Sequence, residues 1–372
     1  MRVVHLITGL ATGGAEVMLF KLLATMDRAA FQQRVVALTA GGAVAARIAA
    51  LGIPVTTLGL RPGSPNPVGL LRLWRELRRD KPDVLQTWLY HADLLGTAGA
   101  ALAGVPRLAW NVRCSTMDAR YERGMGGVLV GALARLSRRP DVVIFNSAAG
   151  KVLHTKLGYR PRRWEVVPNG FDIDALQPAQ DDVARLRTGL RIDDQAPVIG
   201  LVARYDPVKD HATFLRAAAI LLAEFPVATF VLAGRGCDSN NATLTRLIRD
   251  LGIEASVRLL GERTDIPTVN ATFSIATCCS TGEGFPNAVG EAMAGGKPIV
   301  MTDVGDAREI VGDAGEIVPP SNPAALAEGW LSLLRLPAAE RARIGAVARH
   351  RVEQYFDIRG IAARYEALYR AL

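Results

Sequence analysis

Short runs of apolar residues recur along the first part of the chain, with stretches of three- and four-residue apolar spacing between them. The runs have the length of buried strands, and the intervening spacing is typical of helices that bury one face. Because strands that alternate with helices are usually parallel, the pattern predicts a sheet covered on both faces. Strands are expected at residues 3–7, 34–38, 55–58, 84–86, 107–111 and 142–145, and helices within residues 14–26, 68–79 and 92–103.

The same alternation begins again after Pro197. Strands are expected at residues 198–202, 228–233, 257–260, 273–276 and 298–301, and helices at 212–223, 243–250 and 286–295. Between the two series, Pro168-Asn169-Gly170 predicts a turn. The sequence therefore predicts an α/β protein with two doubly wound, Rossmann-like parallel-sheet domains, residues 1–167 and 168–355, followed by a helical segment at 356–372.

The composition agrees with a globular chain of two domains. Of its 372 residues, 49% are hydrophobic and 22% are charged, which is ample for two cores at ~100–200 residues per domain. No apolar run has the ~18 residues of a membrane-spanning helix, and the N-terminus lacks a signal-peptide pattern, so we expect a cytoplasmic protein. The spacing of Cys114, Cys237, Cys278 and Cys279 fits neither a zinc site nor a disulfide framework.

The charge is unevenly distributed along the chain. Residues 1–167 contain 23 basic and 10 acidic residues, a balance of +13, and the remaining residues carry −5, which gives a net charge of +8. This asymmetry indicates that the first domain meets an anionic surface or acceptor. Nucleic acid is not expected as a partner, because no zinc-finger spacing, RNA-recognition pattern or aromatic-interleaved basic run accompanies the charge.

Two basic stretches also contain many apolar residues, at 70–81 and at 121–139. Such amphipathic basic segments are typical of peripheral contact with an anionic membrane. A packed helix with a solvated basic face is the alternative interpretation.

A loop of small residues leads into a predicted helix within residues 281–296. Gly284 lets backbone amides approach a ligand, and Pro286 suits the first turn of a helix. The amides and the dipole at a helix N-terminus favour a phosphate group. Glu283 and Glu291 would repel a phosphate, but they can accept hydrogen bonds from sugar hydroxyls. The stretch predicts a nucleotide-sugar site, with a helix-start residue and a solvated glutamate as the alternative.

Other candidate residues lie at the carboxyl ends of predicted strands, where open α/β sheets bind ligands. Arg204 and Lys209 follow the first strand of the second series. Arginine provides a planar fork and lysine a point charge, so the pair could clamp a diphosphate and stabilise it as a leaving group. In the first series, Gly13 and Gly14 follow one strand and His91 follows another.

Three segments resemble glycosyltransferase family 4, whose members have the GT-B fold. They are Val166–Asp172 with Pro-Asn-Gly, Glu283-Gly-Phe-Pro with Glu291-Ala-Met-Ala-Gly-Gly-Lys-Pro, and Thr302-Asp-Val-Gly305 with Glu309-Ile-Val. The resemblance covers nearly the whole chain. It implies two domains that face a cleft, a final helix that crosses back to the first domain, and retaining transfer of a sugar from a nucleotide-diphospho-sugar to an acceptor hydroxyl.

The resemblance, together with the strand-end positions, gives each candidate residue an expected role. Glu16 would orient the acceptor or cap its own helix. The expected catalytic residues are Arg204, Lys209, Glu283 and His91; the donor contacts are Gly13, Gly14, Arg235, Arg263, Gly284, Phe285, Pro286, Asn287 and Glu291; the acceptor contacts are Glu16, Asp93, Asn111 and Arg113.

No cofactor and no metal are expected, because the nucleotide-sugar is a substrate and the chain has no Asp-x-Asp motif. Positive side chains and a helix end would replace the cation. We expect a UDP-sugar donor, with a GDP-sugar as the alternative. The expected acceptor is a saccharide or a lipid-linked saccharide in cell-surface polysaccharide synthesis, met at the inner face of the cell membrane.

Two other functions are compatible with parts of the sequence. A nucleotide-sugar 2-epimerase would use a similar two-domain fold, but it needs acid and base side chains around the sugar that the Glu283–Glu291 motif does not supply. A non-enzymatic module that binds anions or nucleic acid would use the basic first half.

Overall fold

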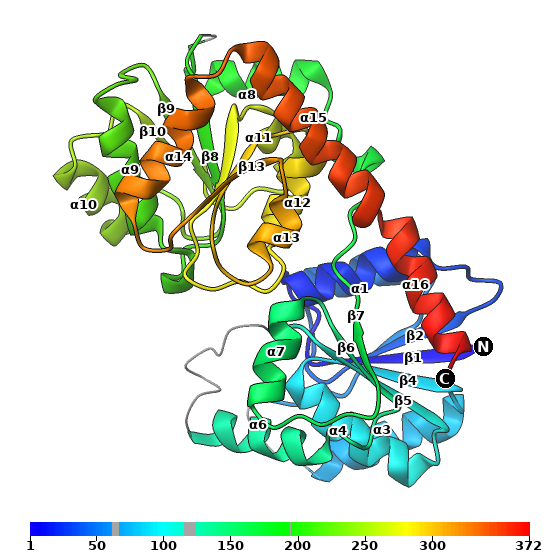
Figure 1. Cartoon of the computed structure of the whole chain (residues 1–372). Coiled ribbons are helices and arrows are strands. Elements are labelled where there is room, and N and C mark those ends of the chain that lie inside the picture. Colours follow the sequence, from blue (N-terminus) through cyan, green and yellow to red (C-terminus); the bar gives the residue numbers. More distant parts are fainter. Residues whose placement is uncertain (62–66, 115–123, 194) are drawn as a thin grey trace. The chain divides into compact units, whose positions relative to one another are not determined.

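The computed structural model describes residues 1–61, 67–114, 124–193 and 195–372, which form two compact units (Figure 1). The first unit contains Met1–Gly170 and Ile358–Leu372, and the second contains Phe171–Asp357. The sequence placed the corresponding boundaries after residues 167 and 355.

The first unit is built on a seven-stranded sheet of parallel strands in the order β3-β2-β1-β4-β5-β6-β7. The order reverses between β1 and β4, which is the type of position at which open α/β sheets bind ligands. All six strands predicted for this part are present, and a short edge strand is added. The strands are β1 (Arg2–Ile7), β2 (Gln32–Ala37), β3 (Val55–Thr57), β4 (Val84–Trp88), β5 (Arg107–Val112), β6 (Val142–Phe145) and β7 (Trp164–Val166).

Helices cover both faces of this sheet with buried apolar side chains. Met18, Ile48 and Tyr365 belong to the core on one face, and Leu77 and Leu129 belong to the core on the other. The first face is covered by α1 (Gly14–Thr25), α2 (Ala43–Ala50) and α16 (Ile358–Arg370), and the second by α3 (Pro67–Asp80), α4 (Tyr90–Ala103) and α6 (Gly124–Leu136), with α7 (Ala148–Lys156) after β6.

The second unit repeats the plan with a six-stranded parallel sheet in the order β10-β9-β8-β11-β12-β13. Its order reverses between β8 and β11, so the loops after these two strands meet at one edge of the sheet. The last strand was not predicted from the sequence. The strands are β8 (Val198–Val202), β9 (Thr229–Ala233), β10 (Val257–Leu259), β11 (Ile275–Cys278), β12 (Ile299–Thr302) and β13 (Gly315–Val318).

Two buried apolar clusters, one on each face of the second sheet, hold its helices in place. Cys278 and Cys279 are buried at the end of β11, as their apolar surroundings in the sequence predicted. The helices are η1 (Asp174–Leu176), α8 (Gln180–Gly189), η2 (Pro207–Lys209), α9 (His211–Leu222), α10 (Ala242–Asp250), α11 (Ile266–Ala271), α12 (Asn287–Ala294), α13 (Ala307–Val311), α14 (Pro323–Leu334) and α15 (Ala338–Tyr355).

The final helix, α16, returns to the first unit and is bonded to its sheet. Tyr369 donates a hydrogen bond to Gln86 Oε1 on β4, and Asn111 Nδ2 on β5 donates to the Tyr365 hydroxyl at 2.8 Å. All four side chains are buried. Because buried amides are costly when unpaired, these bonds fix the position of α16 on the sheet.

The connection between β4 and α4 contains an unusual backbone conformation. Leu89 is the single residue between the two elements and has φ 73° and ψ 155°. This region is adopted almost only by glycine, so a leucine there is strained. Bonds on both sides hold it, because Leu89 N donates to Asn111 O and Asp93 N donates to Leu89 O. These bonds fix the start of α4, which carries His91 in its first turn.

Replacing Leu89 by glycine should relieve this strain. We expect Leu89→Gly to exceed Leu89→Ala in free energy of unfolding by about 1–3 kcal/mol, because both variants lose the side chain and only glycine favours the native φ. Urea unfolding of the two variants measures the difference. Equal stabilities would show that the backbone at this position is not strained.

Candidate active site

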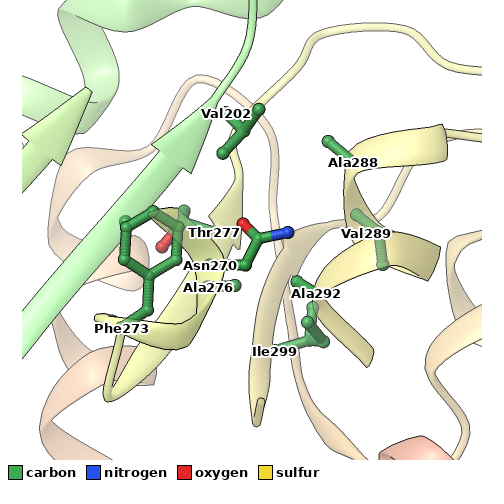
Figure 2. Close-up of a pocket in the computed structure, with 10 residues that line it drawn as sticks. Val202, Asn270, Phe273, Ala276, Thr277, Ala288, Val289, Ala292 and Ile299 are labelled. Carbon is green, nitrogen blue, oxygen red and sulfur yellow. The ribbon is translucent and has the colours of Figure 1, made fainter. Parts of the chain in front are cut away.

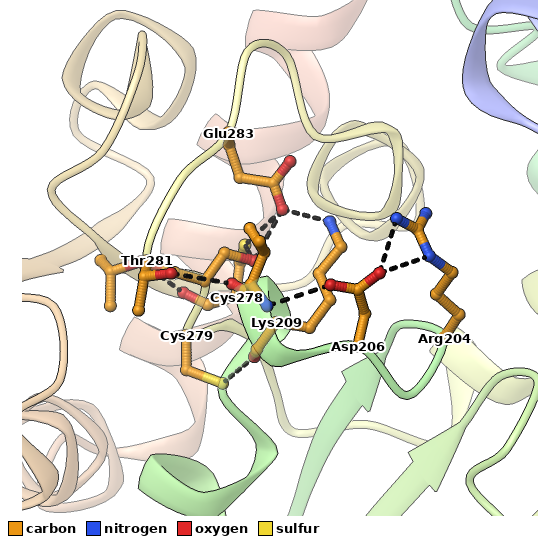
Figure 3. A network of polar contacts seen from close by, with 10 residues as sticks. Arg204, Asp206, Lys209, Cys278, Cys279, Thr281 and Glu283 are labelled. Carbon is orange, nitrogen blue, oxygen red and sulfur yellow. Dashed lines mark hydrogen bonds and ion pairs between the residues drawn. The ribbon is translucent and has the colours of Figure 1, made fainter. Parts of the chain in front are cut away.

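An ion pair at the carboxyl edge of the second sheet joins two of the predicted catalytic residues. Lys209 Nζ, at the end of η2, donates to Glu283 Oε1 in the loop after β11 (Figure 3). The two side chains are only 20% and 11% exposed. Ser280 Oγ donates to the same carboxylate oxygen at 2.6 Å. A backbone bond from Thr281 N to Val208 O, 2.8 Å long, ties the two loops together.

Arg204 lies in the same network, but it is paired with a different carboxylate. Its Nε and Nη2 donate to Asp206 Oδ2 at 3.1 and 3.0 Å, and the arginine side chain is 53% exposed (Figure 3). Burial opposes ionisation of Asp206, but the hydrogen bond from Val208 N and the charge of Arg204 outweigh it and lower the pKa. The sequence predicted both cations and missed Asp206, although an aspartate before proline is typical of a cap.

The loop from Glu283 to α12 is held by close backbone packing. A Cβ on Gly305 would lie 2.2 Å from Glu283 O, so only glycine allows the loop after β12 to approach this closely. Phe285 is buried and packs against Phe171 and Phe356, with ring centroids 6.0 and 5.2 Å apart. Its side chain is therefore part of the core, and only its backbone is left for the predicted contact with the donor.

The helix after this loop begins one residue later than predicted. Pro286 is the cap residue, with extended backbone, and α12 runs over Asn287–Ala294. Gly284 lies in the loop before the cap, and Glu291 is half-buried in the second turn of the helix. The amides of the first turn lie next to the Glu283 loop, as an anion site at a helix N-terminus requires.

Arg235 and Arg263, the other donor residues predicted for the second unit, lie on neighbouring loops at the same edge. Backbone bonds from Tyr205 N to Arg235 O and from Gly234 N to Gly261 O connect the loops after β8, β9 and β10. The Arg235 side chain is exposed. Arg263 is held by Asp265, whose hydrogen bonds raise the pKa of the guanidinium.

A small pocket in the second unit is separate from this charged network. It lies beside the first turns of α12 and is lined by mostly apolar side chains, with the Asn270 amide directed into it (Figure 2). Among the described residues, the buried Asn270 side chain has no hydrogen-bond partner. The pocket has the size of a water molecule rather than that of a nucleotide, so it is a packing feature behind α12.

In the first unit, the side chain of Glu16 lies against the predicted glycine loop. Gly13 is the cap residue of α1, and a Cβ on it would lie 2.4 Å from Glu16 Oε2. Burial raises the pKa of Glu16, while the amide of Glu16 and the charge of Arg113 oppose that rise. Of the two predicted roles for Glu16, the carboxylate position fits the helix cap. Gly14 is exposed in the first turn of α1.

Arg113 is the centre of a second polar network in the first unit. Its Nη2 donates to Asn169 Oδ1, its Nη1 donates to Asn111 Oδ1 at 3.4 Å, and its guanidinium lies 5.5 Å from the centroid of the Trp88 ring. Burial lowers the pKa of this guanidinium. The sequence did not identify Asn169 as a partner of this arginine.

Two predicted acceptor contacts are wrong as direct contacts. Asp93 is fully buried and accepts a hydrogen bond from Thr87 Oγ1, and burial raises its pKa well above the usual range. Asn111 is also fully buried and is bonded to Tyr365. Both residues stabilise the first unit. His91, by contrast, is exposed in the first turn of α4, and partial burial lowers its pKa, which favours the neutral imidazole.

The described residues contain no cluster of three or more side chains suited to a metal ion. Within the same residues, no helix is both long and apolar enough to cross a membrane.

Comparison with known proteins gives matches to both units. A family model described as Glycosyltransferase Family 4 matches residues 12–175, and one described as Glycosyl transferases group 1 matches residues 196–335. Among solved structures, Anabaena Alr3699/HepE in complex with UDP is 25% identical, with a TM-score of 0.87 and full coverage of both chains. Sucrose-phosphate synthase from Thermosynechococcus elongatus is 16% identical with a TM-score of 0.81, which shows the fold alone.

Curated relatives match over shorter stretches. The Escherichia coli UDP-Gal:alpha-D-GlcNAc-diphosphoundecaprenol alpha-1,3-galactosyltransferase is 26% identical over 63% of this chain and 61% of its own length. The D-inositol 3-phosphate glycosyltransferase of Mycobacterium tuberculosis is 34% identical over 52% of this chain and 41% of its own length. The chain therefore spans less than two thirds of these relatives. The two matched family models and the paired parallel sheets agree, and the chain belongs to glycosyltransferase family 4 with the GT-B fold.

Proposed function

We propose that the protein transfers a sugar from a UDP-sugar to a hydroxyl of a lipid-linked saccharide, with retention at the anomeric carbon. The observation that carries this proposal is the Lys209–Glu283 pair beside the start of α12. A cation there can bind a phosphate, and a carboxylate next to it can accept hydrogen bonds from a sugar hydroxyl. A sugar joined to a diphosphate presents a phosphate and a hydroxyl side by side.

In this proposal the second unit holds the donor. Lys209 and Arg204 bind the two phosphates, and the first-turn amides of α12 add donors for the same oxygens. Glu283 and the amides from Gly284 to Asn287 bind ring hydroxyls of the sugar, and Glu291 accepts from the ribose. The loops carrying Arg235 and Arg263 frame the base.

The same groups supply the catalytic effect. When the bond to the anomeric carbon breaks, negative charge develops on the departing phosphate, and preorganised cations stabilise that charge. The acceptor hydroxyl attacks from the face that the phosphate leaves, and the phosphate takes its proton. Retention follows, and neither a metal ion nor a side-chain base is required. In the first unit, His91 and Arg113 assist the acceptor, whereas Glu16 serves its own helix.

The choice of donor and acceptor rests on the relatives. HepE, at 25% identity over its full length, binds UDP. The name of the Escherichia coli relative states a UDP-galactose donor and a diphosphoundecaprenol-linked acceptor. We extend both to this chain and propose that it works at the inner face of the cell membrane in the synthesis of a surface polysaccharide.

The donor is tested by thermal shift with a panel of nucleotides and nucleotide-sugars, followed by assay of nucleotide release. A ligand at a hundred times its Kd stabilises the folded state by about 2.7 kcal/mol. We expect UDP and a UDP-sugar to raise the unfolding temperature while GDP does not. Release of UDP from the UDP-sugar that stabilises the protein supports transfer. Conversion of one UDP-sugar into another without release of UDP would support an epimerase and reject the proposal.

Replacement of Lys209 by alanine tests the role of the cation. We expect Lys209→Ala to lower kcat at least ~100-fold, because one charge-stabilising group is lost from the transition state. Lys156→Ala, at an exposed position on α7, is the matched control and should keep full activity. Unchanged turnover in a folded Lys209→Ala protein would remove this residue from the mechanism.

Chelation tests the expected independence from metal. The purified enzyme should keep its rate of transfer in excess EDTA, because protein cations rather than a bound ion stabilise the diphosphate. A loss of activity that Mg²⁺ or Mn²⁺ restores would contradict this part of the proposal.

A further inference from the structure

A histidine buried in the last turn of α7 is bonded to the first residue of α4. The Tyr90 hydroxyl and His154 Nε2 lie 2.8 Å apart, and both side chains are buried. On the other nitrogen of the ring, His154 Nδ1 lies 2.7 Å from Gly150 O. The pair therefore connects the helix that follows β4 to the helix that follows β6.

The two bonds determine where the protons lie. A backbone carbonyl only accepts, so Nδ1 of His154 carries a proton and donates it to Gly150 O. In the neutral ring Nε2 is then an acceptor, and the Tyr90 hydroxyl donates to it. Burial lowers the pKa of His154 to about 4, against the opposing bond to Gly150, so the ring is neutral near pH 7. Burial likewise raises the pKa of Tyr90, so its hydroxyl keeps the proton that it donates.

Aromatic rings and a close backbone contact hold the imidazole in place. The ring centroids of Phe145 and Tyr159 lie 5.3 and 4.8 Å from that of His154. In the first turn of α7, a Cβ on Gly150 would lie 3.1 Å from Cys114 O, so this helix packs tightly against the chain that follows β5. The imidazole is therefore a fixed partner for a donor on α4.

The donor lies next to the strained junction between β4 and α4. Leu89 has φ 73° and ψ 155°, and Tyr90 is the next residue. A conformation of this kind persists only where the surrounding contacts impose it. The backbone bonds at Leu89 hold the main chain, whereas the bond to His154 anchors the far end of a side chain on the first turn. The hydroxyl bond therefore sets the rotation of this turn about the helix axis.

His91 follows Tyr90 in the same turn. Successive residues of a helix point about 100° apart, and here the tyrosine is buried while the histidine is exposed. Any rotation of the turn moves both side chains together. A displacement of about 1 Å at a reacting group can lower a rate by about 100-fold, so the anchor of Tyr90 controls a direction that matters for catalysis.

We propose that Tyr90 and His154 are positioning residues, which hold the His91 imidazole in the direction that the acceptor requires. The inference rests on the proposed function, because His91 has an acceptor to assist only if the protein transfers a sugar. Neither positioning residue contacts a substrate in the proposed reaction. Binding of the donor belongs to the second unit and should not depend on them.

Kinetics of Tyr90→Phe test the inference, because this variant keeps the ring and loses the donor to His154. We expect kcat to fall ~10-fold, while the Kd of UDP, measured by thermal-shift titration, stays at the wild-type value. Tyr159→Phe is the matched control. Within the part of the chain that the structure describes, the buried Tyr159 hydroxyl has no hydrogen-bond partner. Its removal beside the same imidazole should therefore leave kcat unchanged.

Two replacements of His154 separate positioning from packing. In His154→Gln the side-chain carbonyl can accept from Tyr90 in place of Nε2, so we expect this variant to keep most of the wild-type kcat. His154→Leu occupies similar space without an acceptor and should lower kcat as far as Tyr90→Phe does. Equal rates for the two folded variants would overturn the inference, because packing alone would then account for the effect. If His154→Leu does not fold, the two tyrosine variants decide.

Proton NMR of the His91 ring provides a measurement that does not need transfer. In the wild type, partial burial lowers the pKa of His91. If Tyr90→Phe frees the first turn of α4, the imidazole becomes more hydrated and its pKa should rise toward the ordinary value. Tyr159→Phe should leave this pKa in place. The resonance is assigned by its loss in His91→Gln.

The outcomes distinguish the two proposals. A wild type without transfer activity would reject the proposed function, and the positioning of His91 would then be decided by its pKa alone. The inference is overturned if Tyr90→Phe leaves either the kcat of an active enzyme or the pKa of His91 at the wild-type value. It is also overturned if Tyr159→Phe changes these quantities as much as Tyr90→Phe does.

Discussion

An ion pair between residues 74 positions apart in the chain organises the polar edge of the second unit. Lys209 and Glu283 are both largely buried, and a charge in such a place is costly unless it is paired. Each charged side chain therefore holds the other in place, and the pair joins the loop after β8 to the loop after β11. An anion would compete with Glu283 for the ammonium group, and a hydroxyl would compete with Lys209 for the carboxylate. A sugar phosphate bound as proposed would replace both partners at once and would leave neither charge unpaired.

The parallel direction of the strands brings these loops together, and that direction could be predicted from the sequence. Short apolar runs that alternate with helical spacing were sufficient to predict the two sheets. Glycine, lysine and arginine residues just after these runs marked the ends of the strands. Lys209 and Glu283 lie close together for this reason, because the loops after neighbouring parallel strands lie at one edge of the sheet. The short edge strands β7 and β13 were missed, since three or four half-buried residues have little periodicity.

The remaining errors concern the direction of side chains rather than the position of elements. Asp93 lies just past β4 and Asn111 lies near the end of β5, as predicted, but both side chains are buried, bonded to Thr87 and Tyr365 respectively. Glu16 closes over Gly13 because α1 begins there, and Arg204 finds its partner two residues further on. Each outcome depends on contacts between distant segments or on local caps, which apolar periodicity does not report.

The hydrogen bonds of α16 have a consequence for the order of folding. Gln86 and Asn111 lie in the middle of the first sheet, and their partners Tyr369 and Tyr365 are translated only after the whole of the second unit. Until those tyrosines arrive, the nascent sheet has two amides without their native partners, and one apolar face lacks the part of its cover that α16 supplies. The first unit therefore stays incomplete on the ribosome until α16 has been synthesised.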